Sequence, residues 1–401
     1  MKQSNYLQAL ALLIALLGLF PFVGCEKYTG DKTDLSFIDV PEFQDRDIAY
    51  VPILPVLDNY VYPTDVVAGF DELIYVVDNG TEEIISLDQA GNELGRIMVP
   101  GVKAMVQDRR LDILAIGTKD TVIQGDAYSL TTIYRINQRE NGYGLNNARI
   151  TKSIVHPFYF KTSFTSSDAD VEFNGIGIFG DNFFTVTRTG PRNNPSQFGG
   201  PDDAVLQFNS TDQYITPISV TTNIGFFSDY FKQPSGIATL AQPPQNFDIS
   251  LSRDFVFTSL SPNSALKVQL IRFFQSDFGS SYEVEDLISG DTTQAERFLY
   301  EPNRFDDPVD CTIAGDETSY LFVVDATRDS LYQFTLTGLE GVQPPAGAAS
   351  RKNVIASFGG TGQGLDQFNE PRGVAILDEI LYVADAGNGR VLRYRLTTDF
   401  E

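Results

Sequence analysis

Apolar residues in this sequence occur mostly in short runs that are separated by residues favouring turns. Near the C-terminus, apolar and polar side chains alternate around Val374 and Ile376, and a continuous apolar run follows at Leu381–Val383. Alternation indicates a strand with one buried face, whereas a short continuous run indicates a strand that is buried on both faces. Asp385, Gly387 and Asn388 then favour a turn, because such residues bond nearby backbone or tolerate positive φ. The pattern predicts consecutive strands joined by tight turns, and no long amphipathic helix is evident in the chain.

The same order of elements recurs upstream. In the two best copies, Pro308–Cys311 precedes the run Leu321–Asp325, and Pro63–Val66 precedes Ile74–Asp78. The aspartate that ends each of the three runs is followed nine residues later by an apolar or aromatic residue, at Leu87, Phe334 and Tyr394. Weaker copies pair Val102–Met105 with Ile113–Gly117, Asn174–Ile176 with Phe183–Thr187, and Pro234–Ile237 with Phe255–Ser259. The chain therefore contains six similar units, with five or seven as the alternatives because the second unit is poorly marked.

Repeats of this length, each with four short strands, indicate an all-β fold of the β-propeller class. We expect a six-bladed propeller over residues 48–401. The last unit also resembles an NHL repeat, and the resemblance implies a propeller of the NHL type. It rests on Phe358–Gly360, Gln367–Phe368, Pro371–Ala375, Leu381–Asp385, Asn388, Arg390–Val391 and Tyr394.

The end of the chain predicts how the ring closes. The sequence stops soon after Val391–Leu396, which is the third strand of the last unit, so a fourth strand is missing there. The apolar segment 48–56 lies just before the first unit and is free to supply that strand. Pro52 and Pro55 fit this position, because proline is tolerated at the edge of a sheet. We therefore expect residues 48–56 to lie beside residues 390–396.

The N-terminus carries a different apolar pattern. Lys2 is followed by an apolar region, Leu7–Val23, and its longest uninterrupted stretch is the 15 residues Ala9–Val23. A membrane-spanning helix needs about 20 apolar residues, so a secretory signal peptide over 1–24 is the better interpretation. The residues Val23-Gly24-Cys25 resemble a bacterial lipobox, in which the cysteine is acylated and becomes the first mature residue. The alternative is an ordinary signal peptide followed by an incidental cysteine.

The resemblance to lipoproteins implies a location. Residues 25–47 are mostly polar and are expected to form a lipidated tether, and Glu26-Lys27 with Asp31-Lys32 resembles the start of Bacteroidetes surface lipoproteins. This implies an outer-membrane protein on the cell surface, held in the lipid bilayer through acylated Cys25. The periplasmic face of the outer membrane is the alternative.

Charge narrows the choice of partners. The 401 residues include 29 Lys and Arg and 53 Asp and Glu, which gives a formal net charge of −24. Binding to nucleic acid needs clustered basic residues, so this balance argues against such a partner. The same charge repels anionic lipid, and the acyl chains must therefore supply the membrane affinity.

Residues that commonly carry catalysis are scarce. The single histidine, His156, cannot form the multi-histidine metal site that the NHL-like amidoglycine lyases use. Cys311 occupies a strand position that is apolar in other units, so we expect it to be buried. No G-x-S-x-G motif is present. These observations predict a protein without catalytic residues, cofactor or metal.

Aspartates recur at two positions of the repeat. Asp78, Asp325 and Asp385 end the second strands, where we expect their carboxylates to cap turns; a ring of carboxylates for a cation is the alternative. Asp65 and Asp310 lie in first strands, which line the central channel of a propeller. We expect them at the channel mouth, as solvated residues or, alternatively, as ligands of Ca²⁺.

Three insertions supply the candidates for binding. Residues 118–131 and 188–203 lengthen connections between second and third strands, and residues 275–307 lengthen the path to the next unit. These connection types emerge on one face of a propeller, and long loops on a rigid scaffold often bind partners. The candidate residues on this loop face are Arg188, Arg192, Asn193, Phe198, Phe278 and Tyr282.

Together these features predict a membrane-anchored lipoprotein with a non-enzymatic propeller that binds or assembles with a protein partner in the outer membrane. One rival is a glycan- or peptide-binding protein for nutrient capture. Another is a propeller lyase or hydrolase that uses Asp, Tyr and Arg at the channel mouth.

Overall fold

The computed structural model describes residues 48–156, 164, 166–191, 202–227, 229–243, 252–277, 279–285, 293–344 and 350–399, which belong to one compact unit, Asp47–Glu401. The expected signal peptide (1–24) and tether (25–47) lie outside the described residues, as do Cys25, Arg192, Asn193, Phe198 and Phe278. No helix in the described ranges has the length and apolar character needed to cross a bilayer.

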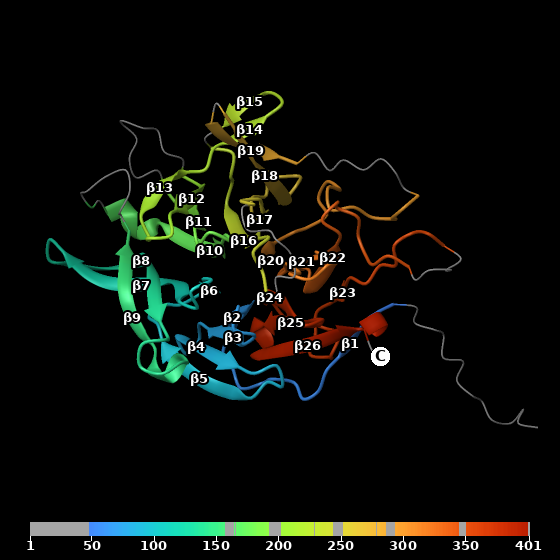
Figure 1. The fold of residues 1–401 in the computed structure, drawn as a ribbon, viewed down its shortest axis with the longest axis horizontal. Coiled ribbons are helices and arrows are strands. Elements are labelled where there is room, and N and C mark those ends of the chain that lie inside the picture. The colour runs from blue at the N-terminus through green and yellow to red at the C-terminus, as the bar shows by residue number, and fades with distance from the viewer. Residues whose placement is uncertain are drawn as a thin grey trace, which may run out of the picture. The chain divides into compact units, whose positions relative to one another are not determined.

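Six sheets, antiparallel except for the β14–β19 pair at the edge of one of them, surround a common centre and form a six-bladed β-propeller (Figure 1). The first strand of each blade lies nearest the centre, and the later strands lie progressively outward (Figure 1). Blade 1 contains β2(Pro63–Ala68), β3(Ile74–Asp78), β4(Glu83–Leu87) and β5(Glu93–Met98); blade 2 contains β6(Ala104–Gln107), β7(Ile113–Ile123), β8(Asp126–Asn137) and β9(Arg149–Val155); blade 3 contains β10(Glu172–Ile178), β11(Phe184–Thr189), β12(Ala204–Phe208) and β13(Tyr214–Pro217).

The other three blades follow the same plan with local additions. Blade 4 contains β16(Pro234–Thr239), β17(Phe255–Ser259), β18(Val268–Ser276) and β19(Gly279–Val284), with β14(Val220–Thr222) and β15(Gly225–Phe227) added at its outer edge. Blade 5 contains β20(Pro308–Ile313), β21(Leu321–Asp325), β22(Ser330–Phe334) and β23(Phe358–Gly359); blade 6 contains β24(Pro371–Leu377), β25(Ile380–Asp385), β26(Arg390–Leu396) and β1(Tyr50–Pro52). The predicted fold class and blade number are therefore confirmed.

Packing between blades explains why the second strands have continuous apolar sequences. In β3, Ile74 and Val76 pack in the core shared with blade 6, whereas Tyr75 and Val77 pack in the core shared with blade 2. All four side chains are fully buried. Both faces of the strand are thus covered, and burial of apolar surface at about 25 cal/mol per Å² holds neighbouring blades together. Similar clusters lie at each of the other junctions between blades.

The aspartates that end the second strands cap the turns that join neighbouring segments. The Asp78 carboxylate accepts hydrogen bonds from the backbone N–H groups of Val61, Tyr62 and Gly80 at 2.8–3.0 Å. Asp325 and Asp385 are also fully buried and accept backbone N–H bonds in the corresponding places. The expectation that these carboxylates have a structural role is confirmed.

The N-terminal segment closes the ring as predicted. Strand β1 pairs with β26 in antiparallel register, with Tyr50 opposite Leu396 and Pro52 opposite Tyr394. The N–H of Ile53 continues the pairing by donating to the carbonyl of Arg393 at 2.8 Å. The strand is shorter than the segment 48–56, since Pro52 and Pro55 have no N–H to donate to the neighbouring strand.

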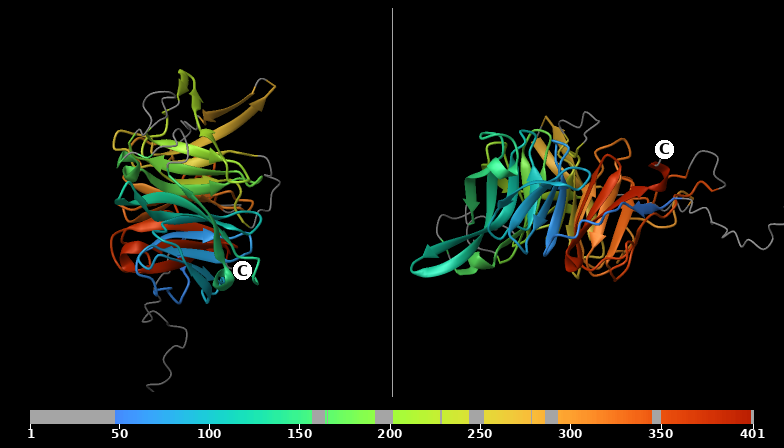
Figure 2. Two further views of the ribbon diagram at one scale, coloured as in Figure 1. Left: turned by 90° about the vertical axis from the view of Figure 1, so that its left-hand side faces the viewer. Right: turned by 90° about the horizontal axis from the view of Figure 1, so that it is seen from below.

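Part of the third insertion does not lie on the expected loop face, which corrects the sequence-based expectation for residues 275–284. Residues 118–131 extend β7 and β8 into a long hairpin between the second and third strands of blade 2. Residues 275–284 instead complete β18 and β19, whose hairpin joins the third and fourth strands of blade 4. In an antiparallel blade these two connections lie at opposite ends of the strands. Figure 2 shows both hairpins projecting beyond the body of the ring.

Two of the residues expected on the loop face lie in the interior instead. Arg188 is 1% exposed in β11, and its guanidinium donates to the carbonyls of Gly190 and Pro191. Tyr282 is 8% exposed in β19, packs against Phe255 and accepts a hydrogen bond from Gln207 at 3.0 Å. Arg188 is buried because both faces of β11 are covered, and the register of β19 turns Tyr282 toward the core.

Candidate functional site

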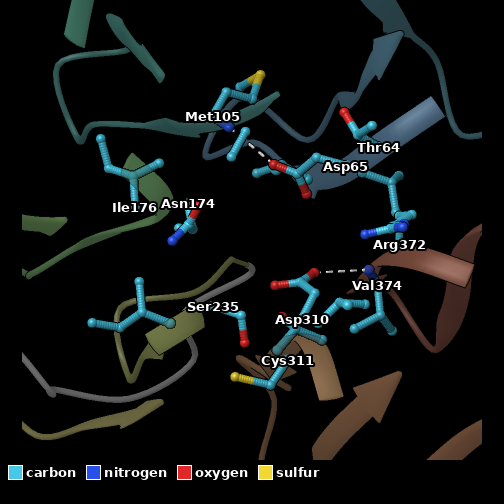
Figure 3. A pocket seen from close by; sticks show the side chains of 18 of the residues that line it. Thr64, Asp65, Met105, Asn174, Ile176, Ser235, Asp310, Cys311, Arg372 and Val374 are labelled. Atoms are coloured by element: carbon cyan, nitrogen blue, oxygen red, sulfur yellow. Dashed lines mark hydrogen bonds between the residues drawn. The ribbon is translucent and has the colours of Figure 1, made fainter. Parts of the chain in front are cut away.

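The inner strands place a set of equivalent residues around a central cavity of about 410 Å³ (Figure 3). Five of the six inner strands carry a bulge near their start, which shifts the register against the second strand by one residue. A bulge bends the strand and redirects its side chains. Residues near the start of all six inner strands line the cavity. One residue from each is Thr64, Lys103, Asn174, Ser235, Val309 and Arg372.

At the next position along each inner strand, neighbouring strands approach so closely that three of the six residues are glycine. A Cβ atom on Gly236 would lie 2.7 Å from the Cα of Asp310, and one on Gly373 would lie 2.7 Å from the Cα of Asp65. Gly175 is similarly crowded by Ser235 and Gly236. Glycine at these positions therefore allows the contact, and only Asp65 and Asp310 project carboxyl groups from this level.

Each of the two aspartates is held by the following blade. One Asp65 oxygen accepts a hydrogen bond from the Met105 N–H at 2.9 Å, and one Asp310 oxygen accepts from the Val374 N–H at 3.0 Å. The two carboxyl groups point toward each other across the cavity (Figure 3). The structure thus brings together, in one cavity, the two residues that the sequence placed at the channel mouth.

Burial makes two negative charges at this level unfavourable. It raises the pKa of Asp65 to about 7. Burial, together with the charge of Asp65, also raises the pKa of Asp310 well above its ordinary value. Backbone hydrogen bonds lower both pKa values but do not cancel the effect of desolvation. Near neutral pH, the pair therefore retains a proton in the ligand-free cavity.

Charged residues at the entrance are already paired with one another. The Lys103 ammonium lies 3.2 Å from a carboxylate oxygen of Glu172, and the Arg372 guanidinium lies 3.9 Å from Glu370. The Tyr62 hydroxyl donates to Glu370 at 2.9 Å. These partly exposed pairs are weak individually. They surround the entrance with both signs of charge, whereas the interior level carries only the two carboxyl groups.

The cavity offers little for metal binding or nucleophilic catalysis. In the described ranges no three His, Cys, Asp or Glu side chains gather to hold a metal ion. Two carboxyl groups, each with one oxygen bound to backbone, fall short of the six to eight oxygens that Ca²⁺ prefers. Burial and then Asp310 raise the pKa of Cys311, which keeps it a neutral thiol. His156 is elsewhere, buried and 3.2 Å from Asp168.

Sequence reasoning found the carboxyl pair but missed the rest of the lining. Lys103, Asn174, Ser235 and Arg372 all belong to the repeat, one position before the close contact between inner strands. Their alignment across the units was the available signal, because residues at one repeat position lie at one level of a propeller.

Comparisons with known proteins support the fold alone. No protein-family model matches the chain, and no curated protein matches it in sequence. A PQQ-bound aldose sugar dehydrogenase from Streptomyces coelicolor is similar in structure, with 11% identity, 87% of this chain and 98% of that chain covered, and a TM-score of 0.50. Virginiamycin B lyase from Staphylococcus aureus is 12% identical, with a TM-score of 0.45. The match covers 87% of this chain and 99% of the lyase chain. An auxiliary nutrient binding protein from Bacteroides thetaiotaomicron is 10% identical, with a TM-score of 0.45. The match covers 84% of this chain and 69% of the nutrient binding protein.

Proposed function

We propose that this chain is a lipid-anchored envelope protein whose propeller binds a small ligand in its central channel without transforming it. The observation that carries the proposal is the 410 Å³ cavity, into which Asp65 and Asp310 project from blades 1 and 5, on either side of blade 6. A cavity of this size, with a few convergent polar groups on rigid strands, has the characteristics of a small-molecule site. The anchor is supported by the lipobox-like residues that end at Cys25. The NHL-like last unit supports a propeller of the NHL type, and the segment after Cys25 supports a place at the outer membrane.

Binding is favoured over catalysis by the chemistry of the lining. Acyl transfer needs a nucleophile beside a base, and the only thiol of the lining, Cys311, is held neutral. The carboxyl pair could move a proton, which keeps a propeller lyase or hydrolase as the rival. Turnover of a bound compound by the purified protein, lost on replacing Asp65, would establish that rival.

The binding proposal is tested by thermal unfolding of the purified protein with amines, sugars, amino acids, nucleosides and short peptides. A ligand at about 100 times its Kd stabilises the folded state by about 2.7 kcal/mol, which is a shift of several degrees in Tm. We expect at least one class to do this and to occupy the channel in a crystal structure. The absence of any such compound, or binding only outside the channel, would contradict the proposal.

A second candidate function is docking to a protein partner, and it rests on an exposed apolar patch of blade 4. Ile224 and Phe226 on the β14–β15 hairpin are 83% and 69% exposed, and Phe274 in β18 is 50% exposed. Strand register places Phe226 in line with Arg272, two residues from Phe274, so the two phenyl rings lie on the same face of the six-stranded sheet. Clustered exposed apolar side chains often mark interaction sites.

The docking candidate predicts a partner that depends on this patch. Affinity purification from detergent-solubilised membranes should recover a stoichiometric protein with the wild type and lose it with Ile224→Ser/Phe226→Ser. Val122→Ser is the matched control, because Val122 is 72% exposed on the other projecting hairpin. Recovery of the same protein with both variants, or of none with the wild type, would remove this candidate.

A further inference from the structure

The strongest unexplained feature of the cavity is an electrostatic imbalance at one level of the channel. Asp65 and Asp310 come from blades 1 and 5, which are separated by blade 6. Each carboxyl group uses one oxygen to bind the backbone of the next blade and directs the other toward the cavity. The arrangement holds two like charges close together in a poorly solvated place, which costs free energy unless a proton or a cation is present.

The surrounding groups do not neutralise this pair. Lys103 and Arg372 line the entrance but are paired with Glu172 and Glu370, and neither contributes appreciably to the pKa of either aspartate. The side chains of Thr64, Asn174 and Ser235 are engaged by neighbouring carbonyl or hydroxyl groups. The titratable or charged groups that line the cavity besides the pair, from every inner strand or the residues just before it, are Tyr62, Lys103, Glu172, Cys311 and Arg372.

We propose that the channel ligand presents an organic cation with N–H donors, such as a primary ammonium or an amidinium, that binds between Asp65 and Asp310 in exchange for a proton. This inference rests on the proposed binding function and specifies its ligand class. Two carboxyl groups that face each other from blades 1 and 5 suit a cation with several N–H donors, since charge-assisted hydrogen bonds to carboxylates are strong and directional. The same two oxygens are too few for a divalent metal ion.

Exchange for a proton gives the binding a particular pH dependence. Raised pKa values keep a proton on the pair when the channel is empty, and the incoming cation displaces it to solvent. Affinity should therefore increase about tenfold between about pH 6 and about pH 8, because an alkylammonium stays charged until about pH 10. A tenfold increase over two pH units corresponds to the release of about half a proton per bound cation near neutral pH.

The test uses n-butylammonium chloride, with n-butanol as the neutral analogue and CaCl₂ as the metal. Calorimetric titration of the wild type should show butylammonium binding with proton release, which is measured by repeating the titration in buffers of different ionisation enthalpy. Asp65→Asn and Asp310→Asn each keep an oxygen for the backbone N–H group, so they should fold and yet bind at least about tenfold more weakly. Asp126→Asn is the matched control, because it removes one exposed charge at the tip of the β7–β8 hairpin.

Several results would overturn the inference. Equal binding of n-butanol, tighter binding of Ca²⁺ that is lost in Asp65→Asn, or butylammonium binding without proton release would each contradict it. If neutral or anionic compounds bind in the channel and butylammonium does not, the ligand class is wrong but the binding function stands. If no compound of any class binds there, the binding function fails as well. Proton release is measured on the wild type, so the test survives poor folding of either variant.

Discussion

Aspartate has two different roles in this propeller, and the number of N–H donors around each carboxylate distinguishes them. Asp325 is buried at the end of a second strand and accepts bonds from the N–H groups of four residues, Asp306, Asp307, Thr327 and Arg328. Asp65 and Asp310 each accept one N–H from the next blade and face one another. The first arrangement satisfies a negative charge, whereas the second leaves it in need of a counter-ion.

Removing a capping carboxylate should destabilise the fold. Asp325→Ala leaves its four N–H donors without their acceptor, and we expect a loss of about 2–4 kcal/mol in the free energy of unfolding. In urea unfolding, the denaturant concentration at the midpoint should fall, while the slope of the unfolding free energy against urea concentration stays unchanged. The control is Asp126→Ala at an exposed position, which should change stability by less than about 0.5 kcal/mol. Equal midpoints for the two variants would show that the caps contribute little.

Removing a channel carboxyl group should change how stability depends on pH. The pKa of Asp65 is about 7 in the folded protein, whereas a solvated aspartate has a pKa of 3.8, so the folded state binds more protons between these values. The stabilisation is complete at the acidic end and is lost as pH rises from about 4 to about 7. In Asp65→Asn, this decline should be smaller by on the order of a few kcal/mol. Parallel pH profiles for both proteins, measured by urea unfolding without ligand, would contradict the raised pKa.

At the scale of strands, the sequence is most informative where both faces of an element are buried. Runs such as Ile74–Asp78 and Leu321–Asp325 matched the observed second strands because neighbouring blades cover both of their faces. Outer strands are partly exposed, as the mixed burial of Glu93–Met98 shows, and their residues carry a weaker pattern. The fold could thus be predicted from its most buried layer.

The candidate site could be predicted only in part. Asp65 and Asp310 stand out because glycine or alanine occupies the equivalent place in other units, and repeat position alone puts them on the channel wall. Their mutual approach depends on the bulges, which come from backbone pairing and leave no mark in composition. Arg188 and Tyr282 were misplaced for a related reason, since β11 and β19 continue further than their apolar cores and turn these side chains inward.

Strand β1 should be required for a stable ring. Deleting residues 48–53 from the full chain removes β1 and leaves β26 as an exposed edge, since its pairing with Tyr50–Pro52 is lost. We expect a lower Tm and self-association, because unpaired edge strands readily pair with other chains. Calorimetry and size-exclusion chromatography measure the two effects. Removing residues 26–31 is the control, and it should leave both properties unchanged; similar behaviour of the two deletions would contradict a closing role for β1.

At the scale of the whole molecule, charge and lipid have separate consequences for the membrane. Removal of residues 1–24 takes away one positive charge, Lys2, and no acidic residue, so the mature chain has a formal charge of 28 − 53 = −25. A protein this acidic is repelled by anionic headgroups. If acylated Cys25 anchors the protein, the acyl chains must supply the attachment against this repulsion.

The lipid anchor predicts a simple partition. In cells, Cys25→Ser should move the protein from the membrane fraction to the soluble fraction. The purified variant should also fail to float with anionic vesicles at low salt, where screening over a Debye length of about 30 Å leaves the repulsion strong. Zwitterionic vesicles are the control. Retention of Cys25→Ser in membranes, or its flotation with anionic vesicles, would contradict anchoring by lipid alone.

The closure of the ring also sets the order in which the molecule can be completed. The N–H of Ala49 bonds the Thr397 hydroxyl, and these two residues are separated by 348 positions along the chain. Contacts between residues so distant in sequence form late, because the loop between them must be ordered first. During synthesis from the N-terminus, β1 emerges early, but its partner β26 emerges after all the other described strands. Until then β1 is an unpaired strand that can pair with other chains, so nearly the whole polypeptide must be available before the propeller can close.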